Sequence, residues 1–505
     1  MSITLRPYQQ RAIDQLRDAI RAGYKRIVLV SPTGSGKTEM AFEIVRGAVA
    51  KAKRLGFVAN RIHLIDQTSR RMQAAGLEHG IIQGQNSRRE YMNLLACSIQ
   101  TLARRQSLKN IGEFDVPVID EAHTTAGSSD YRKLMFAHKD KVIIGLTATP
   151  FAKGMAKSFS EIGGPLWETC VVAASYSELI RDGYLVDCDV YAPSEPDMRG
   201  YKARKNAAGE LDYSDEDAGK AMSTDKLVGD IVEHWQRLAN GTPTVCFAST
   251  IDHSKKLVER FRAAGVRAEH IDCYTDNNAR REILRRVESG ETTLISNVGI
   301  LCEGWDFPAC STLILARPTR SLIRFMQMGG RVLRPAPGKG RALILDHSGT
   351  CVRLGFPTDD REYDLDDGKP KEAGKDSQED EAPKLKACPK CGHVDREQRN
   401  PCPSCGHQRT HQPREIAEGD GQLKKLERSE KFDMATKQQW WSQLLHRARE
   451  KGYKDGWAAN KYREKFGVWP RGVQDVMQPP TQEVSNWLIS SQIRYAKGKE
   501  RQRAA

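Results

Sequence analysis

A glycine-rich segment near the amino terminus combines the residue types that bind phosphate. It lies between an apolar run at Ile27–Val30 and a helix-compatible stretch at Glu39–Val49. Its glycines let backbone N–H groups approach phosphate oxygens, while Lys37 can neutralise their charge and the Thr38 hydroxyl can ligate Mg²⁺. Ser31 stands where the strict pattern has glycine. The residues predicted to cradle the phosphates of a nucleotide are Thr33, Gly34, Ser35, Gly36, Lys37 and Thr38.

Two acidic residues follow at the end of another apolar run, Val116–Ile119. A parallel α/β sheet gathers its ligands at the carboxyl ends of its strands, so Asp120 can hold Mg²⁺ directly or through water. Glu121 can then orient or deprotonate an attacking water molecule. Either motif alone could be structural, for example an acidic cluster that caps a helix. Together and in this order they indicate phosphoryl transfer from a nucleotide.

Alternating strand-like and helix-like segments must position these residues. The first such stretch runs from Ile27 to about Val190 and the second from about Asp225 to Gly355. This pattern is typical of parallel sheets covered by helices, so we predict two α/β domains. The clearest strands are expected at Ile27–Val30, Val116–Ile119, Val142–Leu146, Thr244–Ala248, Thr293–Ser296, Thr312–Leu315 and Ala342–Leu345.

The motifs from Leu5 to Pro335 resemble those of superfamily 2 helicases, and Asp120-Glu121-Ala122-His123 is the DEAH-box signature. The resemblance implies two tandem RecA-like P-loop domains that use ATP and Mg²⁺. It also implies that Gln9 reads adenine and that Thr147-Ala148-Thr149-Pro150 couples nucleotide state to the bound strand. Segments 58–67 and 98–102 resemble strand-contacting motifs.

The second α/β stretch contains three further motifs of this family, at 246–250, 303–308 and 327–335. In the family, the last motif supplies arginine fingers, which can stabilise negative charge on the γ-phosphate from the opposite domain. Arg331 and Arg334 are therefore the predicted fingers, although either could instead cap the helix or bind a nucleic-acid phosphate. The resemblance also assigns nucleotide binding to Gly304 and Asp306. The coupling residues that it implies are His123, Thr147, Thr149 and Gln327.

Charge and motif form favour DNA as the partner. Lysine and arginine outnumber aspartate and glutamate by 79 to 65, and the formal charge of +14 favours a polyanion, or is simply a basic surface. The segments 303–308 and 329–335 look more like the branch that includes type III restriction subunits and the repair protein RadD than like spliceosomal DEAH-box proteins. We therefore expect DNA, as a single strand or a fork or duplex junction, with RNA as the alternative.

The leading hypothesis is an ATP-dependent DNA helicase or translocase. One alternative is an RNA-dependent ATPase that remodels ribonucleoprotein. Another is a duplex-DNA motor subunit of a repair or defence complex that does not separate strands itself; a protein partner in repair, replication or defence would fit. No run of about 18 apolar residues suggests a membrane span, and the first residues lack a secretion signal. Because segment 451–467 resembles the ends of phage DEAD/DEAH-box proteins, we expect the cytoplasm of a bacterial or phage-infected cell.

Four clustered cysteines indicate a metal site. Cys388 and Cys391 form one pair and Cys402 and Cys405 a second, each followed by glycine. Four thiolates at this spacing can surround one Zn²⁺ tetrahedrally, in a closed, structural site. The zinc module could contact DNA or could only stabilise a unit too small to fold alone. Replacing Cys388 and Cys391 by serine is expected to lose zinc and spare basal ATP hydrolysis.

The composition predicts six segments along the chain. Residues 359–381 are strongly acidic with few apolar side chains, which is typical of a flexible linker. In the tail, Trp441, Leu444 and Ala448 fall at helical spacing, so a core face is favoured over base stacking. The predicted segments are a first RecA-like domain (1–193), a linker or insertion (194–224), a second RecA-like domain (225–356), an acidic flexible linker (357–383), a zinc ribbon (384–410) and a mainly helical basic region (411–505).

Overall fold

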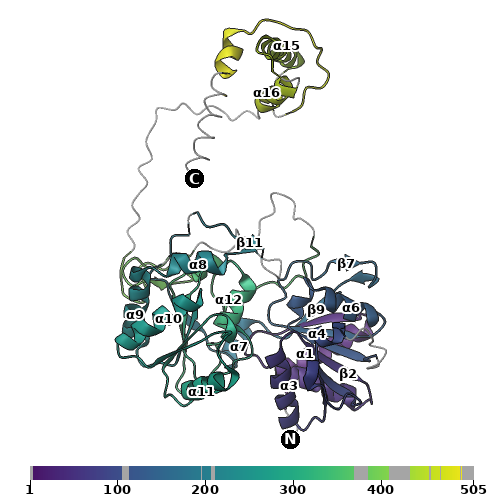
Figure 1. The fold of residues 1–505 in the computed structure, drawn as a ribbon, viewed down its shortest axis with the longest axis vertical. Coiled ribbons are helices and arrows are strands. Elements are labelled where there is room, and N and C mark those ends of the chain that lie inside the picture. The colour runs from purple at the N-terminus through teal and green to yellow at the C-terminus, as the bar shows by residue number, and fades with distance from the viewer. Residues whose placement is uncertain are drawn as a thin grey trace. The chain divides into compact units, whose positions relative to one another are not determined.

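Two compact units make up the chain, residues 1–411 and residues 412–505. The computed structural model describes residues 4–104, 113–194, 196–198, 200–205, 211–368, 385–408, 433–453, 456–466, 468–488 and 491. The first unit has two α/β lobes, drawn in purple to blue and in teal to green in Figure 1. No helix in the described ranges is long and apolar enough to cross a membrane.

The first lobe is built on a seven-stranded parallel sheet with the order β3-β4-β2-β5-β6-β1-β9. β1 and β5 lie on either side of β6, so the residues that follow β1 and β5 reach the same edge of the sheet. The strands are β1 (Arg26–Val30), β2 (Leu55–Ala59), β3 (Gly80–Ile82), β4 (Leu94–Ser98), β5 (Val116–Asp120), β6 (Ile143–Thr147) and β9 (Thr169–Val172).

The second lobe repeats this arrangement with the order β14-β15-β13-β16-β17-β10-β18. All neighbouring strands are parallel except β10 and β18, which pair antiparallel at one edge. The strands are β10 (Cys188–Tyr191), β13 (Thr244–Ala248), β14 (Ala268–Ile271), β15 (Leu294–Asn297), β16 (Thr312–Ala316), β17 (Ala342–Asp346) and β18 (His393–Val394). Two tandem parallel sheets confirm the predicted fold class.

Helices cover both sheets, and several of them begin at a polar side chain that caps the first turn. The Thr224 hydroxyl accepts from Leu227 N at the start of α9, which then buries an apolar face that includes Ile231 and Trp235. The helices of the first lobe are α1 (Pro7–Arg21), α2 (Lys37–Val49), α3 (Ile62–Ala74), α4 (Ile99–Arg104), α6 (Ser129–Ala137) and α7 (Tyr176–Arg181). Those of the second are α8 (Asp215–Met222), α9 (Asp225–Ala239), α10 (Ile251–Ala263), α11 (Asn277–Glu288), α12 (Leu322–Gly329) and α13 (Thr350–Leu354).

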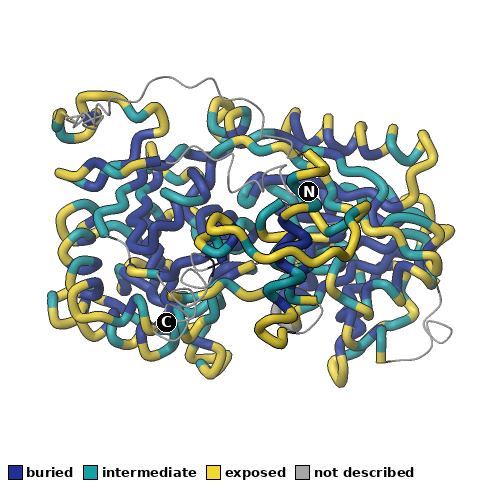
Figure 2. The backbone as a smooth tube through the Cα atoms, turned by 90° about the horizontal axis from the view of Figure 1, so that it is seen from above, coloured by how far each residue is buried: buried dark blue, intermediate teal, exposed yellow. Residues whose placement is uncertain are grey.

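Short elements complete the first unit. They are the 3-10 turns η1 (Gly84–Asn86), η2 (Ala122–Thr125) and η3 (Ile300–Cys302) and the two-residue strands β7 (Ser158–Phe159), β8 (Gly164–Pro165), β11 (Arg204–Lys205) and β12 (Leu211–Asp212). The central strands are buried along their length and form the dark blue interior in Figure 2. One apolar cluster continues from the first lobe into the second through Leu185, Val186 and Cys188.

The boundary predicted after residue 193 needs a correction. β10 pairs with β17, with Cys188 opposite Ala342, so residues 188–191 belong to the second sheet. The first lobe therefore ends before β10. The alternating pattern extended the first α/β stretch to about Val190 but could not say which sheet its last residues join, because pairing partners are set by tertiary contacts.

The predicted linker at 194–224 is packed structure in its described part. The Asp212 carboxylate is buried and accepts hydrogen bonds from Thr319 Oγ1 (2.9 Å), Arg320 N (2.8 Å) and Arg324 Nη1 (2.6 Å). Asp215, at the start of α8, pairs with Arg317. Polar composition predicted exposure here, but these carboxylates are bound by the second lobe.

The acidic linker predicted at 357–383 is ordered up to residue 368, while residues 369–384 lie outside the described residues. The Asp366 carboxylate accepts from Gly154 N at 2.8 Å, and its carbonyl accepts from Ala156 N at 2.7 Å. The Tyr363 ring stacks on Phe151 with centroids 5.5 Å apart. This segment therefore returns from the second lobe to the first, because hydrogen bonds to backbone amides offset its poor hydrophobicity.

The cysteine-bearing residues 385–408 are part of the first unit. β18 extends the second sheet by pairing with β10, with Val394 opposite Val190, and Ala192 N donates to Gly392 O at 2.8 Å. The zinc ribbon was predicted as a separate segment. The pairing shows that it is attached to the edge of the second lobe.

The second unit contains α15 (Met434–Glu450) and α16 (Gly456–Phe466). Trp440, Trp441 and Leu444 are buried and form an apolar cluster with Tyr462. The predicted core face is therefore confirmed. Trp469 stays 46% exposed.

Candidate active site

The phosphate-binding loop lies between β1 and α2, as the sequence predicts. Gly34 and Gly36 have φ values of +88° and +82°, in the left-handed region that favours glycine. Two side chains of α1 hold the loop by hydrogen bonds to one carbonyl. Tyr8 OH donates to Ser35 O, and Gln9 Nε2 donates to the same oxygen at 3.1 Å. A Cβ at Gly36 would overlap the end of the Gln9 side chain and push it away from the loop.

Gln9, the predicted adenine reader, is engaged at both ends of its amide. Its Oε1 accepts from Arg6 N at 2.9 Å while its Nε2 holds the loop. Beside it, the Arg6 guanidinium lies 4.5 Å from the centroid of the Tyr184 ring, and both residues line the same cavity as Lys37. Arg6 and Tyr184 were not predicted as site residues. An adenine-reading role for Gln9 stays a prediction.

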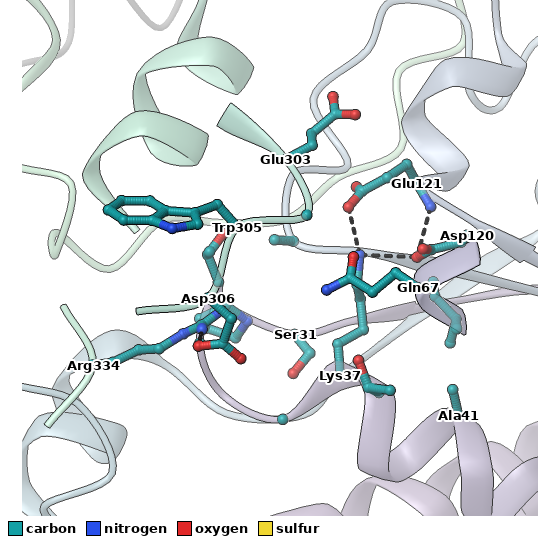
Figure 3. Close-up of a pocket in the computed structure, with 18 of the residues that line it drawn as sticks. Ser31, Lys37, Ala41, Gln67, Asp120, Glu121, Glu303, Trp305, Asp306 and Arg334 are labelled. Carbon is teal, nitrogen blue, oxygen red and sulfur yellow. Dashed lines mark hydrogen bonds and ion pairs between the residues drawn. The ribbon is translucent and has the colours of Figure 1, made fainter. Parts of the chain in front are cut away.

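Lys37 meets the two predicted acidic residues. Its Nζ lies 2.7 Å from Glu121 Oε1 and 3.1 Å from Asp120 Oδ1, as drawn in Figure 3. Burial opposes the lysine's charge, but the two carboxylates outweigh it and raise the pKa of Lys37. Burial also raises the pKa of Asp120, whereas for Glu121 the lysine outweighs burial and keeps the pKa of that carboxyl low. Lys37 is therefore charged and Glu121 ionised at neutral pH.

Glu121 has a strained backbone. Its φ of +50° is in the left-handed region, which a residue with a long side chain rarely adopts. Such strain costs about 1–3 kcal/mol and persists mainly where function requires it. It directs the carboxylate back toward Lys37 (Figure 3).

A buried polar chain connects Glu121 with the end of β6. His123 Nδ1 lies 3.4 Å from Glu121 Oε2, 3.0 Å from Thr147 Oγ1 and 3.5 Å from Thr149 Oγ1. Burial lowers the pKa of His123 to about 4, so the imidazole is neutral at pH 7. The structure thus brings together three of the four predicted coupling residues around the Glu121 carboxylate.

The fourth coupling residue, Gln327, lies on α12 in the second lobe. Its Nε2 is 3.4 Å from Glu303 Oε1, and its carbonyl accepts from Arg331 Nε at 3.2 Å. Glu303 in turn pairs with Arg61 of the first lobe at 3.0 Å. Gln327 therefore belongs to the contact between the lobes rather than to the His123 cluster.

The two predicted fingers face the phosphate loop from the second lobe. Arg331 Nη1 donates to Trp305 O at 2.5 Å, and Arg334 forms an ion pair with Asp306. Burial lowers the pKa of both guanidinium groups, for Arg334 to about 10, which leaves them protonated at neutral pH. In Figure 3, Arg334 and Asp306 lie together across the cavity from the Lys37 cluster.

A cavity of about 330 Å³ separates these two sides. It is lined from the first lobe by the phosphate loop, Asp120 and Glu121, and from the second by residues 302–306, Arg331 and Arg334. Of the predicted nucleotide residues, Gln9 and Ser35 are not among those that line it; those that do are Thr33, Gly34, Gly36, Lys37, Thr38, Asp120, Gly304 and Asp306. We name it the interlobe cavity. Its size is typical of small-ligand sites, and its lining is suited to a triphosphate.

Other cross-lobe contacts were not predicted. Arg71 donates to Thr38 Oγ1 at 2.9 Å and lies 3.3 Å from Asp306 Oδ2. Gly330, at the end of α12, packs so closely on Thr33 that a Cβ there would overlap it. No sequence signal marks Arg71, since its partners Thr38 and Asp306 lie far from it along the chain.

Within the first lobe, Gln100 Nε2 donates to Asn60 O at 2.6 Å, which joins the two segments predicted to contact a strand.

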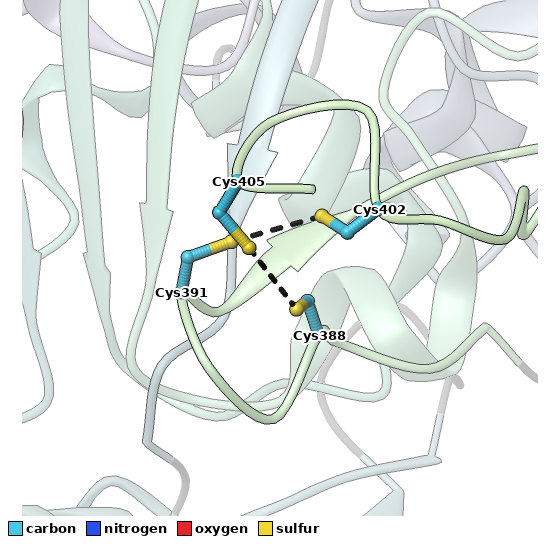
Figure 4. Close-up of side chains that lie close together, drawn as sticks. All are labelled: Cys388, Cys391, Cys402 and Cys405. Carbon is cyan, nitrogen blue, oxygen red and sulfur yellow. Dashed lines mark hydrogen bonds between the residues drawn. The ribbon is translucent and has the colours of Figure 1, made fainter. Parts of the chain in front are cut away.

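The four clustered cysteines have the geometry of a metal site. Their ligand atoms all lie within 4.8 Å of one another, with 3.8 Å between the sulfurs of Cys388 and Cys405 and between those of Cys391 and Cys402 (Figure 4). A tetrahedron of thiolates at about 2.3 Å from Zn²⁺ has edges of about 3.8 Å. The cluster therefore fits the predicted ion.

The fold and the site together define a class. A phosphate loop after the first strand, an acidic pair after a neighbouring strand and arginines from a second α/β lobe are the parts of a two-domain P-loop ATPase. Residues 2–152 match the family model of the type III restriction enzyme res subunit, and residues 225–336 match that of the helicase conserved C-terminal domain. The chain carries the two conserved domains of superfamily 2 helicases and belongs to this class of ATP hydrolases.

Several known proteins are similar to this chain over about two thirds of its length or more. A 51.5 kDa protein of Lactococcus phage (isolate 7-9) is 26% identical over 365 residues, which cover 72% of this chain and 74% of the relative. The EcoAI type I restriction endonuclease subunit of Escherichia coli is 27% identical over 370 residues, covering 65% and 44%. The candidate ATP-dependent helicase IRC3 of Saccharomyces cerevisiae is 26% identical over 389 residues, covering 71% and 55%. The chain thus spans about half the length of the last two.

Among solved structures, a fragment of a candidate HsdR subunit of a type I restriction enzyme from Vibrio vulnificus YJ016 superposes with a TM-score of 0.52 at 21% identity. The match covers 73% of this chain and 68% of that one. At this identity the likeness supports the fold.

Proposed function

We propose that this chain is an ATP-dependent DNA translocase or helicase whose ATPase site is the interlobe cavity. The observation that carries the proposal is the composition of that cavity. Lys37, Asp120 and Glu121 come from one lobe, and Arg331 and Arg334 come from the other. A site shared in this way links the state of the nucleotide to the relative position of the lobes.

In the proposed hydrolysis, water attacks the γ-phosphorus of ATP and the bond to the β–γ bridging oxygen breaks. Glu121, ionised beside Lys37, orients the water and accepts its proton. Lys37 and the two arginines balance the negative charge on the transferred group. Because the phosphate is then released, the arginines lose their common anion, and the lobes can separate.

The family implies Mg²⁺, and the residues present fit it. Thr38 and Asp120 both line the interlobe cavity and offer the oxygen ligands that this ion prefers. When bound, Mg²⁺ supplies further positive charge at the β- and γ-phosphates. The Thr38 hydroxyl also accepts from Arg71, which leaves its oxygen a second lone pair.

Coupling to the strand is proposed to run through His123, Thr147 and Thr149. This row of polar side chains begins at Glu121 and ends at the carboxyl end of β6. The loop that follows β6 is the one on which residues 359–368 pack. A change at Glu121 on hydrolysis would therefore be felt at His123 and, through its hydrogen bonds, at Thr147 and Thr149 at the end of β6.

DNA is the proposed polymer because of the basic composition and the restriction-type relatives. A second candidate function is a duplex-DNA motor that belongs to a repair or defence complex and separates no strands. The similarity to a type I restriction endonuclease subunit favours it. The phage relative supports work in the cytoplasm of a bacterial or phage-infected cell.

We also propose that the four cysteines hold a structural Zn²⁺. The spacing of their sulfurs fits four thiolate ligands, which leave no open position for chemistry. Metal analysis of the purified protein tests this assignment. Cys402→Ser should lower the zinc content, whereas Cys273→Ser, at an exposed cysteine away from the cluster, should not.

The deciding experiment is steady-state ATP hydrolysis with no polymer, single-stranded DNA, duplex DNA and RNA, with Lys37→Ala as the control. DNA should stimulate hydrolysis, and the variant should lose at least about 10²-fold in kcat because the phosphate charge is no longer balanced. If RNA alone stimulates hydrolysis, the proposed polymer is RNA and the DNA assignment is wrong. Equal rates in the variant and the wild type would refute the ATPase site.

Strand displacement on a fork separates the two candidates. A helicase releases the shorter strand, whereas a pure duplex motor hydrolyses ATP on blunt duplex and releases none. A triplex-displacement assay on the same duplex then reports translocation directly.

A further inference from the structure

A four-residue segment, Tyr184–Asp187, contacts three separate parts of the first unit. We name it the joining segment. At its start, Tyr184 lines the interlobe cavity and packs against Tyr8 and Arg6. Near its end, Val186 N donates to Leu333 O at 2.9 Å. Leu333 lies between the two proposed fingers, so this hydrogen bond holds the turn that presents them.

The last residue of the joining segment is bound by the zinc module. Arg396 places Nη1 3.3 Å from Asp187 Oδ2 and Nη2 3.3 Å from Asp187 Oδ1, a forked contact on one carboxylate. Asp187 also accepts from Thr358 Oγ1 at 3.0 Å and from Arg341 Nη2 at 3.1 Å. Arg396 itself lies 3.9 Å above the ring of Phe356. The guanidinium is therefore fixed on its flat face and along its edge.

The zinc module can hold Arg396 in place because the module is itself anchored. β18 ends at Val394, two positions before this arginine, and pairs with β10. Tyr191 OH lies 3.1 Å from Ser404 Oγ, between the second pair of cysteines. The same β10 strand begins directly after Asp187. The module pairs with β10 and the joining segment leads directly into β10, so both are attached to the same strand.

We propose that Arg396 is a positioning residue for ATP hydrolysis, which acts through Asp187 and the joining segment to hold Arg331 and Arg334 at the γ-phosphate. The inference rests on the proposed function, since it assumes that these arginines act in hydrolysis. It gives the zinc module a role in the motor and does not require the module to touch DNA. The earlier expectation that losing zinc would spare basal hydrolysis is then reversed.

The magnitude of the effect follows from the precision that catalysis needs. A misplacement of about 1 Å in a catalytic group can cost about 10²-fold in rate. Arg341 and Thr358 continue to hold Asp187 when Arg396 is removed, so the displacement should be partial. We expect Arg396→Ala to lower kcat about tenfold, with ADP affinity within about twofold of the wild type.

Arg399→Ala is the matched control. Arg399 lies in the same module and pairs with Asp395 at 2.9 Å and Glu397 at 3.4 Å, which also belong to the module. Both variants remove one arginine near the cysteines. Only Arg396→Ala should lower kcat, while zinc content and melting temperature should be alike in the two. Equal kcat in Arg396→Ala and the wild type would overturn the proposal.

A double-mutant cycle separates positioning from general damage. Arg334→Lys keeps the charge but loses the planar fork of the finger. If Arg396 acts through the fingers, adding Arg396→Ala in this background should lower kcat less than about twofold, because the position it secures is already compromised. The same tenfold loss in both backgrounds would indicate a structural effect and reject the inference.

The two hypotheses fail differently. If Arg331→Ala and Arg334→Ala hydrolyse ATP like the wild type, the proposed arginine fingers are wrong. If they lose activity while Arg396→Ala does not, only the positioning role is wrong. Should Arg396→Ala fail to fold, Asp187→Asn carries the test from the other side, with the same expected loss of kcat and unchanged zinc content.

Discussion

Glu121 is the residue on which the proposed chemistry depends most. It is ionised because Lys37 lies 2.7 Å away, and it is aimed by a backbone conformation that glutamate rarely adopts. His123 approaches its other oxygen as a neutral imidazole. The carboxylate is therefore a strong hydrogen-bond acceptor inside a cavity that also has room for a triphosphate.

Glu121→Gln should lower kcat by about 10²–10⁴-fold, the usual contribution of a general base, since an amide accepts no proton. ATP binding should persist, because Lys37 and the phosphate loop are unchanged. Equilibrium binding of a fluorescent ATP analogue, measured beside steady-state hydrolysis, checks both parts. Loss of binding together with hydrolysis would mean that Glu121 shapes the site rather than acts in it.

Three buried histidines make stability depend on pH. Burial lowers the pKa of His123 and His253 to about 4 and that of His347 to about 3. Between these values and about 6.5, the unfolded chain binds protons at these positions and the folded chain does not. The folded state is therefore fully stabilised above about pH 6.5, and stability is lost as the pH falls toward 4.

Each histidine should contribute about 1.4 kcal/mol per pH unit within that window. Melting temperatures measured from pH 7.5 down to 4.5 should fall steadily below about pH 6.5. A profile that stays level to pH 4.5 would contradict neutral burial of these side chains. Urea denaturation at pH 7 and pH 5 provides an independent check.

At the scale of elements, the contact between α12 and the phosphate loop controls how closely the lobes approach. Gly330 packs on Thr33 without room for a Cβ, yet its φ of −59° is ordinary for a helix end. Position 330 thus needs glycine because Thr33 of the neighbouring lobe leaves no room for a Cβ, and not because of its backbone conformation. The sequence alone would attribute this glycine to helix termination.

Gly330→Ala should therefore reduce kcat by about tenfold or more, because a small error in the approach of the fingers is costly. Its melting temperature should change little, since alanine is a better helix former than glycine. Gly340→Ala is the control, as nothing lies within 4 Å of its added Cβ and its φ is not positive. Equal activity of the two variants would show that the lobes do not need this close approach for hydrolysis.

At the scale of the whole molecule, the interlobe cavity and the cysteine module both belong to residues 1–411. The second unit has its own apolar core around Trp440 and Trp441. The two units should therefore fold separately. The described residues that line the interlobe cavity all belong to the first unit.

A protein that ends at His411 should retain basal ATP hydrolysis within about threefold of the full chain, because every residue lining the cavity is present. Calorimetry of the full chain should show an unfolding transition that the shorter protein lacks. Loss of hydrolysis in a shorter protein that remains folded would reveal a catalytic role for residues 412–505.

The sequence by itself determined the parts that local chemistry requires. Glycines followed by Lys37, an acidic pair after an apolar strand and paired cysteines are recognisable because each needs only a few neighbouring residues. The two parallel sheets followed from alternating periodicity for the same reason. The predicted strands each differ from the observed ones by no more than a residue at either end.

The tertiary structure alone decided what lies opposite each part. β10 joins the second sheet, residues 359–368 return to the first lobe, and Arg396 reaches Asp187. None of these could be read from composition, which predicted a boundary, a flexible linker and a separate ribbon. Pairing across the molecule depends on which surfaces meet after folding, and the free energy of those contacts is not encoded in any short window of sequence.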